Sequence, residues 1–488
     1  MVIESLKYKI LQQFGFAPTQ KQGQALDTFV SFLTDRDPQA VMILRGSAGT
    51  GKTSLSGAIV RTLLQIRQKV MLLAPTGRAA KVFSLGSGAP AYTIHRRIYR
   101  EKAFAGVDGQ FSLNDNLYTD TLFMVDEASM IANMGLGGTT FGSGCLLDDL
   151  VKFVYQGHND RLLLIGDKAQ LPPVGEEESP ALSASVMEGY GLKVYECDLN
   201  EVLRQSQSSG ILYNATLIRQ MITHDAVTGL PLIRFKGFAD IVMMPGAELV
   251  ESLGDSYHHV GMDETMVITR SNKRANIYNN GIRNMVLDRE EELSSGDMLM
   301  IVKNNYFWTE KEKKESGEGS AGAVPTFLAN GDRAKVLRVS NYIELYGFRF
   351  ATLLLQLPDY DDYEMQVTGM LDTLQSEAPA LTHEQQEELF RQVEEDYQHF
   401  VPLKADRMKS IRQDAYFNAL QIKYAYAVTC HKAQGGQWAH VYVDQGYMTD
   451  DMLTPDYIHW LYTAFTRATD KLFLVNWPKE QTCEPTDL

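Results

Sequence analysis

A chain of 488 residues exceeds what one hydrophobic core supports, since single cores rarely grow beyond about 250 residues, so two to four packed units are expected. Its 44% hydrophobic and 22% charged residues are ordinary for a globular protein, and no apolar run approaches the roughly 18 residues of a membrane helix. The net charge of −15 weakens a nucleic-acid hypothesis without excluding it, because residues 359–410 alone hold 13 Asp/Glu against 4 Lys/Arg.

The amino terminus and the cysteines predict a cytoplasmic protein. The opening residues, MVIESLKYKILQQFG, contain no secretory apolar region and no cleavage site. The four cysteines have no C-x-x-C spacing, which disfavours a zinc ribbon or an iron–sulfur cluster. Cys430 and His431 are adjacent, but neighbouring residues of a strand point to opposite faces, so a Cys–His catalytic pair is also disfavoured.

The first 200 residues alternate short apolar runs with helical patterns. The β-rich runs lie at residues 41–46, 70–75, 121–127 and 161–167. They end in Gly, Pro or carboxylates, which is typical of buried parallel strands with functional residues at their carboxyl ends. A helix is expected from about Lys52, and its apolar face should carry Leu55, Ile59, Leu63 and Leu64. This part of the chain predicts a doubly wound parallel sheet.

The second part of the chain predicts another α/β unit that carries an insertion. Its β-rich runs lie at residues 265–270, 439–444 and 471–476. Between them the texture changes to strands that open with Gly-Asp turns, as in a small barrel. Residues 383–400 read as a polar, projecting helix, and residues 309–323 as a charged, Gly/Ser-rich loop.

Residues 46–53 read GSAGTGKT and match G-x-x-x-x-G-K-[ST] at every fixed position, between a predicted strand and helix. The glycines let backbone N–H groups converge on phosphates at a helix N-terminus, whereas a plain glycine-rich turn needs no such spacing. Lys52 should reach the β/γ-phosphates of ATP and the Thr53 hydroxyl should bind Mg²⁺. The predicted nucleotide-binding residues here are Gly46, Ser47, Ala48, Gly49, Thr50, Gly51, Lys52, Thr53 and Ser54.

Polar residues that follow later strands complete an ATPase pattern. In VDEAS, Asp126 should hold Mg²⁺ through water and Glu127 should deprotonate the attacking water, although an N-cap acid pair is the alternative. Gln170, in GDKAQLPPVG, can sense the γ-phosphate through its amide. Arg204 and Arg467 are candidate arginine fingers. If both come from a second unit, ATP clamps two units together and hydrolysis releases them.

The order of these motifs resembles the superfamily 1 DNA helicases. From about residue 15 to 476 the chain carries, in that family's order, the Walker A motif (residues 46–53), APTGRAAKVF, TIHRRI, VDEAS, GDKAQLPPVG, LNEVLRQ, VTCHKAQG and YTAFTRA. PTGRAAK and QLPPVG resemble the RecD-like and Dda-like branch, superfamily 1B. The resemblance implies two RecA-like P-loop domains with ATP between them and single-stranded DNA across their tops.

The same resemblance implies roles for further residues. Gln22 matches the adenine-reading glutamine, and Arg204 and Arg467 match the γ-phosphate arginines. Gln434 and Gly435 should face the nucleotide cleft. Where many members carry a ribose-binding Glu, this chain has Gln437. The implied DNA contacts are Pro75, Thr76, Thr93, His95, Thr429, His431 and Lys432.

The resemblance also divides the chain into domains. Residues 1–200 form the first RecA-like domain, in which residues 86–120 correspond to the pin that splits duplex, or else to a plain surface hairpin. Residues 201–295 and 420–488 form the second. Residues 296–419 form an SH3-like β insertion whose acidic helical projection is either a protein-docking surface or a brace.

Single strands are held without sequence preference by a basic groove with aromatic stacking platforms. Trp308 or Trp438 is the candidate platform. Each basic candidate is as readily a solvated surface charge. These candidates are Arg78, Lys81, Arg96, Arg97, Arg270, Lys273 and Arg274. No role is assigned to the glycine-rich residues 135–144.

The predicted function is an ATP- and Mg²⁺-dependent monomeric helicase that moves 5′→3′ on single-stranded DNA and unwinds tailed duplexes in repair, recombination or replication. Its direction comes from the resemblance alone. An RNA helicase is one alternative, since nothing in the sequence discriminates 2′-OH reading. A nucleotide-switched scaffold ATPase is another, against which Glu127, Arg204 and Arg467 argue.

Overall fold

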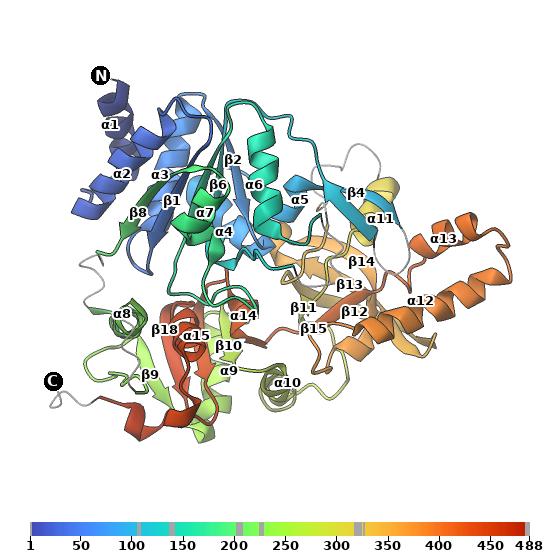
Figure 1. The fold of residues 1–488 in the computed structure, drawn as a ribbon. Coiled ribbons are helices and arrows are strands. Elements are labelled where there is room, and N and C mark those ends of the chain that lie inside the picture. The colour runs from blue at the N-terminus through green and yellow to red at the C-terminus, as the bar shows by residue number, and fades with distance from the viewer. Residues whose placement is uncertain are drawn as a thin grey trace.

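The computed structural model describes residues 2–104, 109–135, 142–201, 208–223, 229–316, 325 and 327–483. Two parallel sheets lie one above the other, a barrel lies beside them, and two helices project from the barrel (Figure 1). The expected α/β architecture with a small inserted β unit is therefore confirmed. Arg204 and parts of the segments 135–144 and 309–323 lie outside the described residues.

The first sheet has the strand order β3-β2-β6-β7-β1-β8, and every neighbouring pair is parallel. Its strands are β1 (Ala40–Gly46), β2 (Lys69–Ala74), β3 (Ala91–Thr93), β6 (Thr121–Val125), β7 (Arg161–Gly166) and β8 (Lys193–Leu199). The flanking helices are α1 (Val2–Phe14), α2 (Gln20–Leu33), α3 (Lys52–Gln65), α4 (Gly77–Ser87), α5 (Ile94–Ile98), α6 (Leu146–Gln156) and α7 (Ala184–Gly189). Two hydrophobic clusters cover the two faces, so this sheet is a central layer.

The burial of each strand explains which strands could be predicted from the sequence. β1, β6 and β7 are almost wholly buried and correspond to the predicted apolar runs. β8 is a largely exposed edge strand whose mixed sequence, KVYECDL, gives no apolar run. One expectation for α3 was wrong, because Leu64 is 45% exposed, whereas Leu55, Ile59 and Leu63 are buried as predicted.

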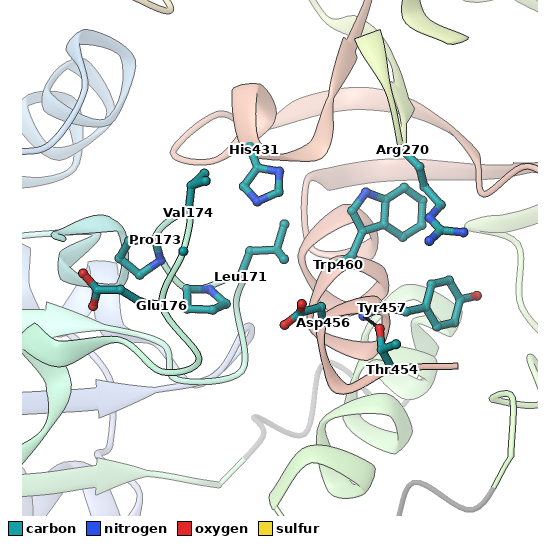
Figure 2. Close-up of a pocket in the computed structure, with 12 residues that line it drawn as sticks. Leu171, Pro173, Val174, Glu176, Arg270, His431, Thr454, Asp456, Tyr457 and Trp460 are labelled. Carbon is teal, nitrogen blue, oxygen red and sulfur yellow. Dashed lines mark hydrogen bonds between the residues drawn. The ribbon is translucent and has the colours of Figure 1, made fainter. Parts of the chain in front are cut away.

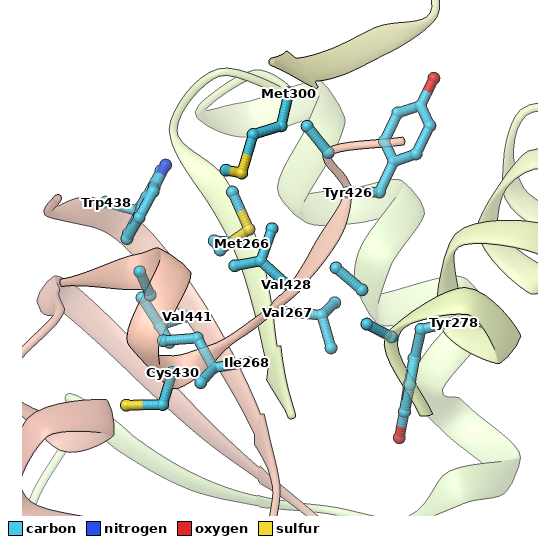
Figure 3. Packing of buried hydrophobic residues seen from close by; sticks show 14 of the residues in the cluster. Met266, Val267, Ile268, Tyr278, Met300, Tyr426, Val428, Cys430, Trp438 and Val441 are labelled. Carbon is cyan, nitrogen blue, oxygen red and sulfur yellow. The ribbon is translucent and has the colours of Figure 1, made fainter. Parts of the chain in front are cut away.

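The second sheet has the parallel order β16-β10-β17-β18-β9. Its strands are β9 (Ile241–Met244), β10 (Thr265–Thr269), β16 (Ala427–Thr429), β17 (Trp438–Asp444) and β18 (Ala468–Val475). The helices are α8 (Gly210–Thr223), α9 (Leu249–His259), α10 (Asn272–Gly281), α14 (Cys430–Ala433) and α15 (Pro455–Phe465). Figure 3 shows Met266, Val428 and Trp438 packed around β10, within one hydrophobic cluster that also includes barrel residues.

The inserted barrel closes in the order β11-β12-β13-β14-β15. Its strands are β11 (Met298–Ile301), β12 (Arg333–Leu345), β13 (Phe348–Leu357), β14 (Tyr363–Met370) and β15 (Leu420–Tyr424). α11 (Phe307–Ser316) lies beside it. α12 (His383–Gln398) and α13 (Lys404–Arg412) form the projection, which a small cluster including Leu389 and Val393 anchors to the barrel (Figure 1). The projecting polar helix is thus confirmed.

We predict that Gly57→Ala destabilises the first sheet unit, because α3 and α4 touch at Gly57. A Cβ there would lie 2.4 Å from the carbonyl oxygen of Gly86, which is backbone and cannot rotate away. The expected loss is about 1–3 kcal/mol of unfolding free energy, measured by denaturant titration. Gly23→Ala in α2 is the matched control, since a Cβ there meets nothing within 4 Å and alanine favours a helix. Equal stability of the two variants would contradict this contact.

Candidate nucleotide and nucleic-acid site

The loop between β1 and α3 is built as an anion site. Gly49 and Gly51 have φ of 75° and 79°, in the left-handed region that side chains disfavour. α3 begins at Lys52 without a side-chain cap, so its first N–H groups and its dipole point to the loop. The Lys52 ammonium donates to the Gly46 carbonyl and lies 3.9 Å from Asp167 Oδ2. The loop can therefore hold a phosphate group.

The two predicted acidic residues lie at the carboxyl end of β6. Glu127 has a left-handed backbone (φ 51°), and its N–H donates to Asp126 Oδ1 (2.9 Å). Burial raises the pKa of Asp126 above its usual range, and the Glu127 carboxylate adds to the rise, while the Glu127 N–H and Lys52 lower it. Two crowded carboxylates with one nearby lysine favour a bound cation. The donor set therefore fits Mg²⁺ held by Asp126, Thr53 and a nucleotide phosphate.

Gln170 connects the predicted water-activating carboxylate to the predicted arginine finger. With its amide oriented by its neighbours, its nitrogen lies 3.3 Å from Glu127 Oε2 and its oxygen 3.3 Å from Arg467 Nη2. Arg467 is buried and donates to the carbonyls of Thr463 (3.1 Å) and Gly436 (3.0 Å). Three of the predicted catalytic side chains thus meet across the boundary between the sheets.

The second sheet unit also contacts the Walker A loop directly, through residues to which the sequence had assigned no role. The Ala48 N–H donates to Tyr462 Oη (3.0 Å), and that hydroxyl donates to Asp167 Oδ2 (2.6 Å). The Arg219 guanidinium donates to Ser47 Oγ (2.5 Å). Tyr462 and Asp167 lie inside quoted motifs, YTAFTRA and GDKAQLPPVG, so their motif membership was the available signal. Arg219, in α8, belongs to no motif.

Gln22, the predicted adenine-reading residue, lies beside the phosphate loop. Its amide nitrogen donates to the Thr50 carbonyl (2.9 Å), and its amide oxygen accepts from the Thr19 N–H (2.9 Å). It is therefore also the reciprocal partner of the capping box that begins α2. This double use fixes Gln22 beside Walker A and leaves one amide hydrogen to donate.

Short segments near Gln434 bind the loop after β7 to the second unit. Leu171 donates its N–H to Thr463 Oγ1 (2.8 Å), and its carbonyl accepts from Gln434 Nε2 (2.8 Å). Gly435, the residue after Gln434, has φ 74° and lies against the start of α4. A Cβ added to Gly435 would be 3.1 Å from Thr76 Oγ1. The predicted cleft residues therefore contact the first sheet unit.

Three of the predicted DNA contacts are helix N-caps at the carboxyl ends of parallel strands. The Thr76 hydroxyl accepts from the Ala79 N–H and the Thr93 hydroxyl from the Arg96 N–H, while Thr429 holds the N-cap position of α14 without a side-chain hydrogen bond to that helix. Pro75 lies directly before the first of them. A threonine hydroxyl that accepts from its own helix retains a proton for a phosphate oxygen. These caps lie on two sheets, as a track across both requires.

The other predicted contacts differ in exposure and charge. Burial lowers the pKa of His95 to about 4, which keeps this imidazole neutral at pH 7. His431 is exposed, whereas Cys430 points into the hydrophobic core (Figure 3), where burial raises its thiol pKa to about 12. The predicted absence of a Cys–His pair is consistent with this. Lys432 donates to Asn330 Oδ1 of the barrel, and burial lowers its pKa to about 8.

Two expectations for a stacking groove were wrong. Trp438, in β17, is 1% exposed, and Trp308, in the first turn of α11, is 4% exposed and donates its indole N–H to the Asn418 carbonyl (2.9 Å). Arg78 donates to the Gln437 carbonyl (2.7 Å) and its guanidinium lies 4.7 Å from the Trp438 ring centre. Neither tryptophan can stack on a base in this arrangement.

A single acidic residue of the inserted unit lies beside two of the basic candidates. Asp359 lies 3.8 Å from Arg78 and 3.9 Å from Lys81 of α4. Another candidate, Arg274, pairs with Asp444 (2.7 Å). Burial lowers the pKa of Arg78 to about 10, which still leaves it charged at pH 7. Arg78 and Lys81 therefore pair across the contact between α4 and the inserted unit, whereas Arg274 pairs within the second sheet unit.

The segment 86–120 contains an antiparallel hairpin of β4 (Tyr99–Phe104) and β5 (Gly109–Leu113). The ring centres of Phe111 and Tyr306 are 5.0 Å apart, and the Tyr306 ring stacks on that of Phe327 with their centres 4.8 Å apart. The hairpin therefore leans on residues of the inserted unit. The tip, residues 105–108, and the Phe104 side chain lie outside the described part.

A cavity of about 400 Å³ opens where the loop after β7 faces α15 (Figure 2). His431, the exposed predicted DNA contact, lies on its rim together with Arg270. Within the described residues, no group of three or more His, Cys, Asp or Glu could hold a metal ion. None of the helices described is long and apolar enough to cross a membrane.

Comparison with known proteins agrees with this site. The AAA domain family matches residues 17–229, and the UvrD-like helicase C-terminal domain matches residues 424–475. Together they cover more than half of the chain. The first match contains Walker A, the carboxylate pair and Gln170, and the second contains Gln434 and Arg467.

Individual relatives include the ATP-dependent RecD2 DNA helicase of Deinococcus radiodurans, 32% identical over 28% of this chain and 16% of that protein. The ATP-dependent DNA helicase dda of Enterobacteria phage T4 is 25% identical over 53% of this chain and 55% of its own. Both alignments span less than two thirds of the relative. A solved structure of Pif1 helicase from Bacteroides with ADP-AlF3 and ssDNA is 13% identical, covers 96% of this chain and 95% of its own, and has a TM-score of 0.47. The chain therefore combines a region of the AAA domain family with a region of the UvrD-like helicase C-terminal domain family around one shared cleft, and it is similar to the RecD2 and dda helicases of the superfamily 1B branch that its motifs resemble.

Proposed function

We propose that this protein hydrolyses ATP to move 5′→3′ along single-stranded DNA and to unwind tailed duplexes. The observation that carries the proposal is the Gln170 amide between Glu127 and Arg467. A γ-phosphate at Walker A would face all three groups, so its loss would be felt by both sheet units at once. The relatives named RecD2 and dda are described as ATP-dependent DNA helicases, which supports the choice of DNA.

Each predicted catalytic residue has a definable part in the reaction. Lys52 and the α3 N-terminus bind the phosphates, and Glu127 takes the proton of the attacking water. Arg467, and by resemblance Arg204, neutralise charge that grows on the transferred phosphoryl group. Mg²⁺, when bound between Asp126, Thr53 and the nucleotide, would add positive charge at the same oxygens.

We further infer the domain organisation and the partners. Residues 1–200 and the pair 201–295 and 420–488 would act as the two motor domains, with residues 296–419 as their insertion. Single-stranded and tailed duplex DNA are the proposed partners, bound across the threonine caps by a monomer. A cytoplasmic location is also proposed, since the four cysteines, all in the described part of the chain, form no disulfide.

A first prediction concerns polarity. With ATP and Mg²⁺, the protein should displace the strand of a 5′-tailed duplex but not of 3′-tailed or blunt duplexes, in a gel or fluorescence assay. Lys52→Ala should abolish displacement because the phosphate site loses its charge. Unwinding from the 3′ tail would reverse the proposed direction. ATPase stimulation by RNA but not DNA would move the function to RNA.

A second prediction concerns Arg467. Arg467→Ala should lower the single-strand-stimulated ATPase rate by about 10³-fold or more, which is typical of an arginine finger. ATP binding, followed with a fluorescent analogue, should change far less, because the loss is greatest in the transition state. Arg338→Ala, an exposed barrel arginine, is the control and should leave both quantities unchanged. An equal loss of binding and rate would assign Arg467 a ground-state role.

A third prediction concerns Tyr462, whose hydroxyl joins Ala48 to Asp167. Tyr462→Phe removes the donor to a buried carboxylate and the acceptor for a loop N–H, so the unfolding free energy should fall by about 1–3 kcal/mol. The ATPase rate should fall as well, because Walker A loses its contact with α15. Tyr447→Phe, at an 81% exposed position, should change neither. Wild-type behaviour of Tyr462→Phe would show that the bridge is dispensable.

A further inference from the structure

Helix α8 of the second sheet unit lies against the phosphate loop at two points of one helix face. A Cβ on Gly49 would lie 3.2 Å from Leu212 Cδ2. The Arg219 guanidinium donates to Ser47 Oγ (2.5 Å). Leu212 and Arg219 are seven residues apart, which is about two helical turns, so both project from the same face. One rigid element therefore brings an apolar contact and a cation to Walker A.

The second unit fixes α8 through its first turns. The Asp240 carboxylate accepts from the Gly210 N–H (2.7 Å). The buried Asn214 side chain donates to the Arg234 carbonyl (2.9 Å) and accepts from the Arg234 N–H (2.9 Å). Because Arg219 follows on the same helix, the second unit sets the position of its guanidinium.

Arg219 has more hydrogen-bond donors than partners. A guanidinium carries five N–H groups. Within the described residues, this one makes a single hydrogen bond, has no carboxylate at ion-pair distance, and has a buried Nε without a partner. Buried arginines elsewhere differ, since Arg283 pairs with Asp297 (3.0 Å) and Arg467 donates to two carbonyls. A half-buried cation with unused donors is costly unless an anion completes it, and Walker A is where an anion binds.

The surroundings of Arg219 indicate which phosphate it would meet. Burial raises the pKa of Tyr462 and Asp167 adds to the rise, whereas the positive charge of Arg219 opposes it, so the guanidinium lies near this hydroxyl. The same hydroxyl donates to Asp167 Oδ2, which is 3.9 Å from the Lys52 ammonium. A Walker A lysine reaches the β- and γ-phosphates. Arg219 therefore lies on the side of the loop that receives the terminal phosphates.

We propose that Arg219 is a γ-phosphate-binding residue that the second unit adds to Walker A, and that it makes the site prefer ATP to ADP. The inference deepens the proposed function and rests on it, since it assumes that ATP binds at this loop. Ser47 uses one donor of the guanidinium, which leaves the others for phosphate oxygens. The donors of Arg467 are largely used within its own unit and by Gln170. Arg467 is thus suited to the transition state and Arg219 to binding the substrate.

The test measures how Arg219→Ala binds a fluorescent, non-hydrolysable imido analogue of ATP and fluorescent ADP, by fluorescence anisotropy. The ATP analogue should bind on the order of tenfold to hundredfold more weakly, the scale of a charge-assisted hydrogen bond, while ADP keeps its wild-type affinity. In ATPase assays with single-stranded DNA, KM for ATP should rise by a similar factor and kcat should change far less, because the contact precedes the transition state. Arg219→Lys keeps the charge without the planar fork, so it should recover part of the affinity.

Arg36→Ala is the charge-matched control. Arg36 is exposed and precedes β1, at the opposite end of that strand from Walker A, so its loss should change neither affinity. Equal weakening of the ATP analogue and of ADP by Arg219→Ala would overturn the γ-phosphate assignment, as would a fall in kcat at unchanged KM. A structural role would instead lower the free energy of unfolding measured without nucleotide and leave the ratio of ATP to ADP affinity unchanged, which also contradicts the proposal.

Failure of this inference is distinguishable from failure of the proposed function. If the wild-type protein unwinds tailed duplexes with ATP and Arg219→Ala binds the ATP analogue as well as it does, only the role of Arg219 is lost. If the wild-type protein binds ATP but neither hydrolyses it with single-stranded DNA nor unwinds DNA, the helicase proposal is wrong, whatever Arg219 contributes to binding.

Discussion

The contact between the two sheet units depends on how the backbone N–H and carbonyl groups of Leu171 are hydrogen-bonded. This residue belongs to the first sheet unit and is buried, yet its N–H and its carbonyl are bonded by the side chains of Thr463 and Gln434 from the second. His459 adds a hydrogen bond to the Ala169 carbonyl (2.9 Å). A buried peptide group without a partner is costly, so the units must either stay closed or open far enough for water to replace these side chains. Intermediate separations are disfavoured, which suits a motor with discrete states.

The same short segment connects the nucleotide site to the cavity beside α15. Gln170 lies among the catalytic candidates, Leu171 lies at the boundary of the sheets, and Val174 lies at the cavity. Proline at 172 and 173 makes the connection stiff, so displacement at one end is transmitted to the other rather than absorbed. α15 has the corresponding role in the second unit, with Tyr462 and Thr463 toward the cleft and Trp460 toward the cavity.

Charge is distributed in a way that the total of −15 conceals. Much of the acidity lies in the barrel and in its projecting helices, where Asp359 meets basic residues of α4. Thr76 and Thr93, by contrast, cap the N-termini of α4 and α5, whose free N–H groups attract phosphate whatever the net charge of the protein. A strand can therefore be held by an acidic protein, because local backbone dipoles and hydroxyls matter more at contact distance than net charge.

The sequence by itself determined the elements whose signals are local. The Walker A glycines, the carboxylates after β6 and the fully apolar strands are fixed by neighbours in the chain, so their spacing was enough to predict them. The order of motifs likewise indicated the family and the inserted barrel. Edge strand β8 could not be predicted this way, since an exposed strand needs no apolar run.

Only the tertiary structure decided which side chains meet between units. Trp308 and Trp438 look like stacking platforms in the sequence, but packing buries both. Arg78 and Lys81 look like part of a basic groove, but both lie within ion-pair distance of Asp359. Tyr462 and Arg219 touch Walker A from more than 150 residues away, and no local pattern records that contact. The physical reason is that burial and pairing depend on surfaces brought together from distant segments, whereas a helix, a strand or a phosphate loop depends on residues adjacent in the chain.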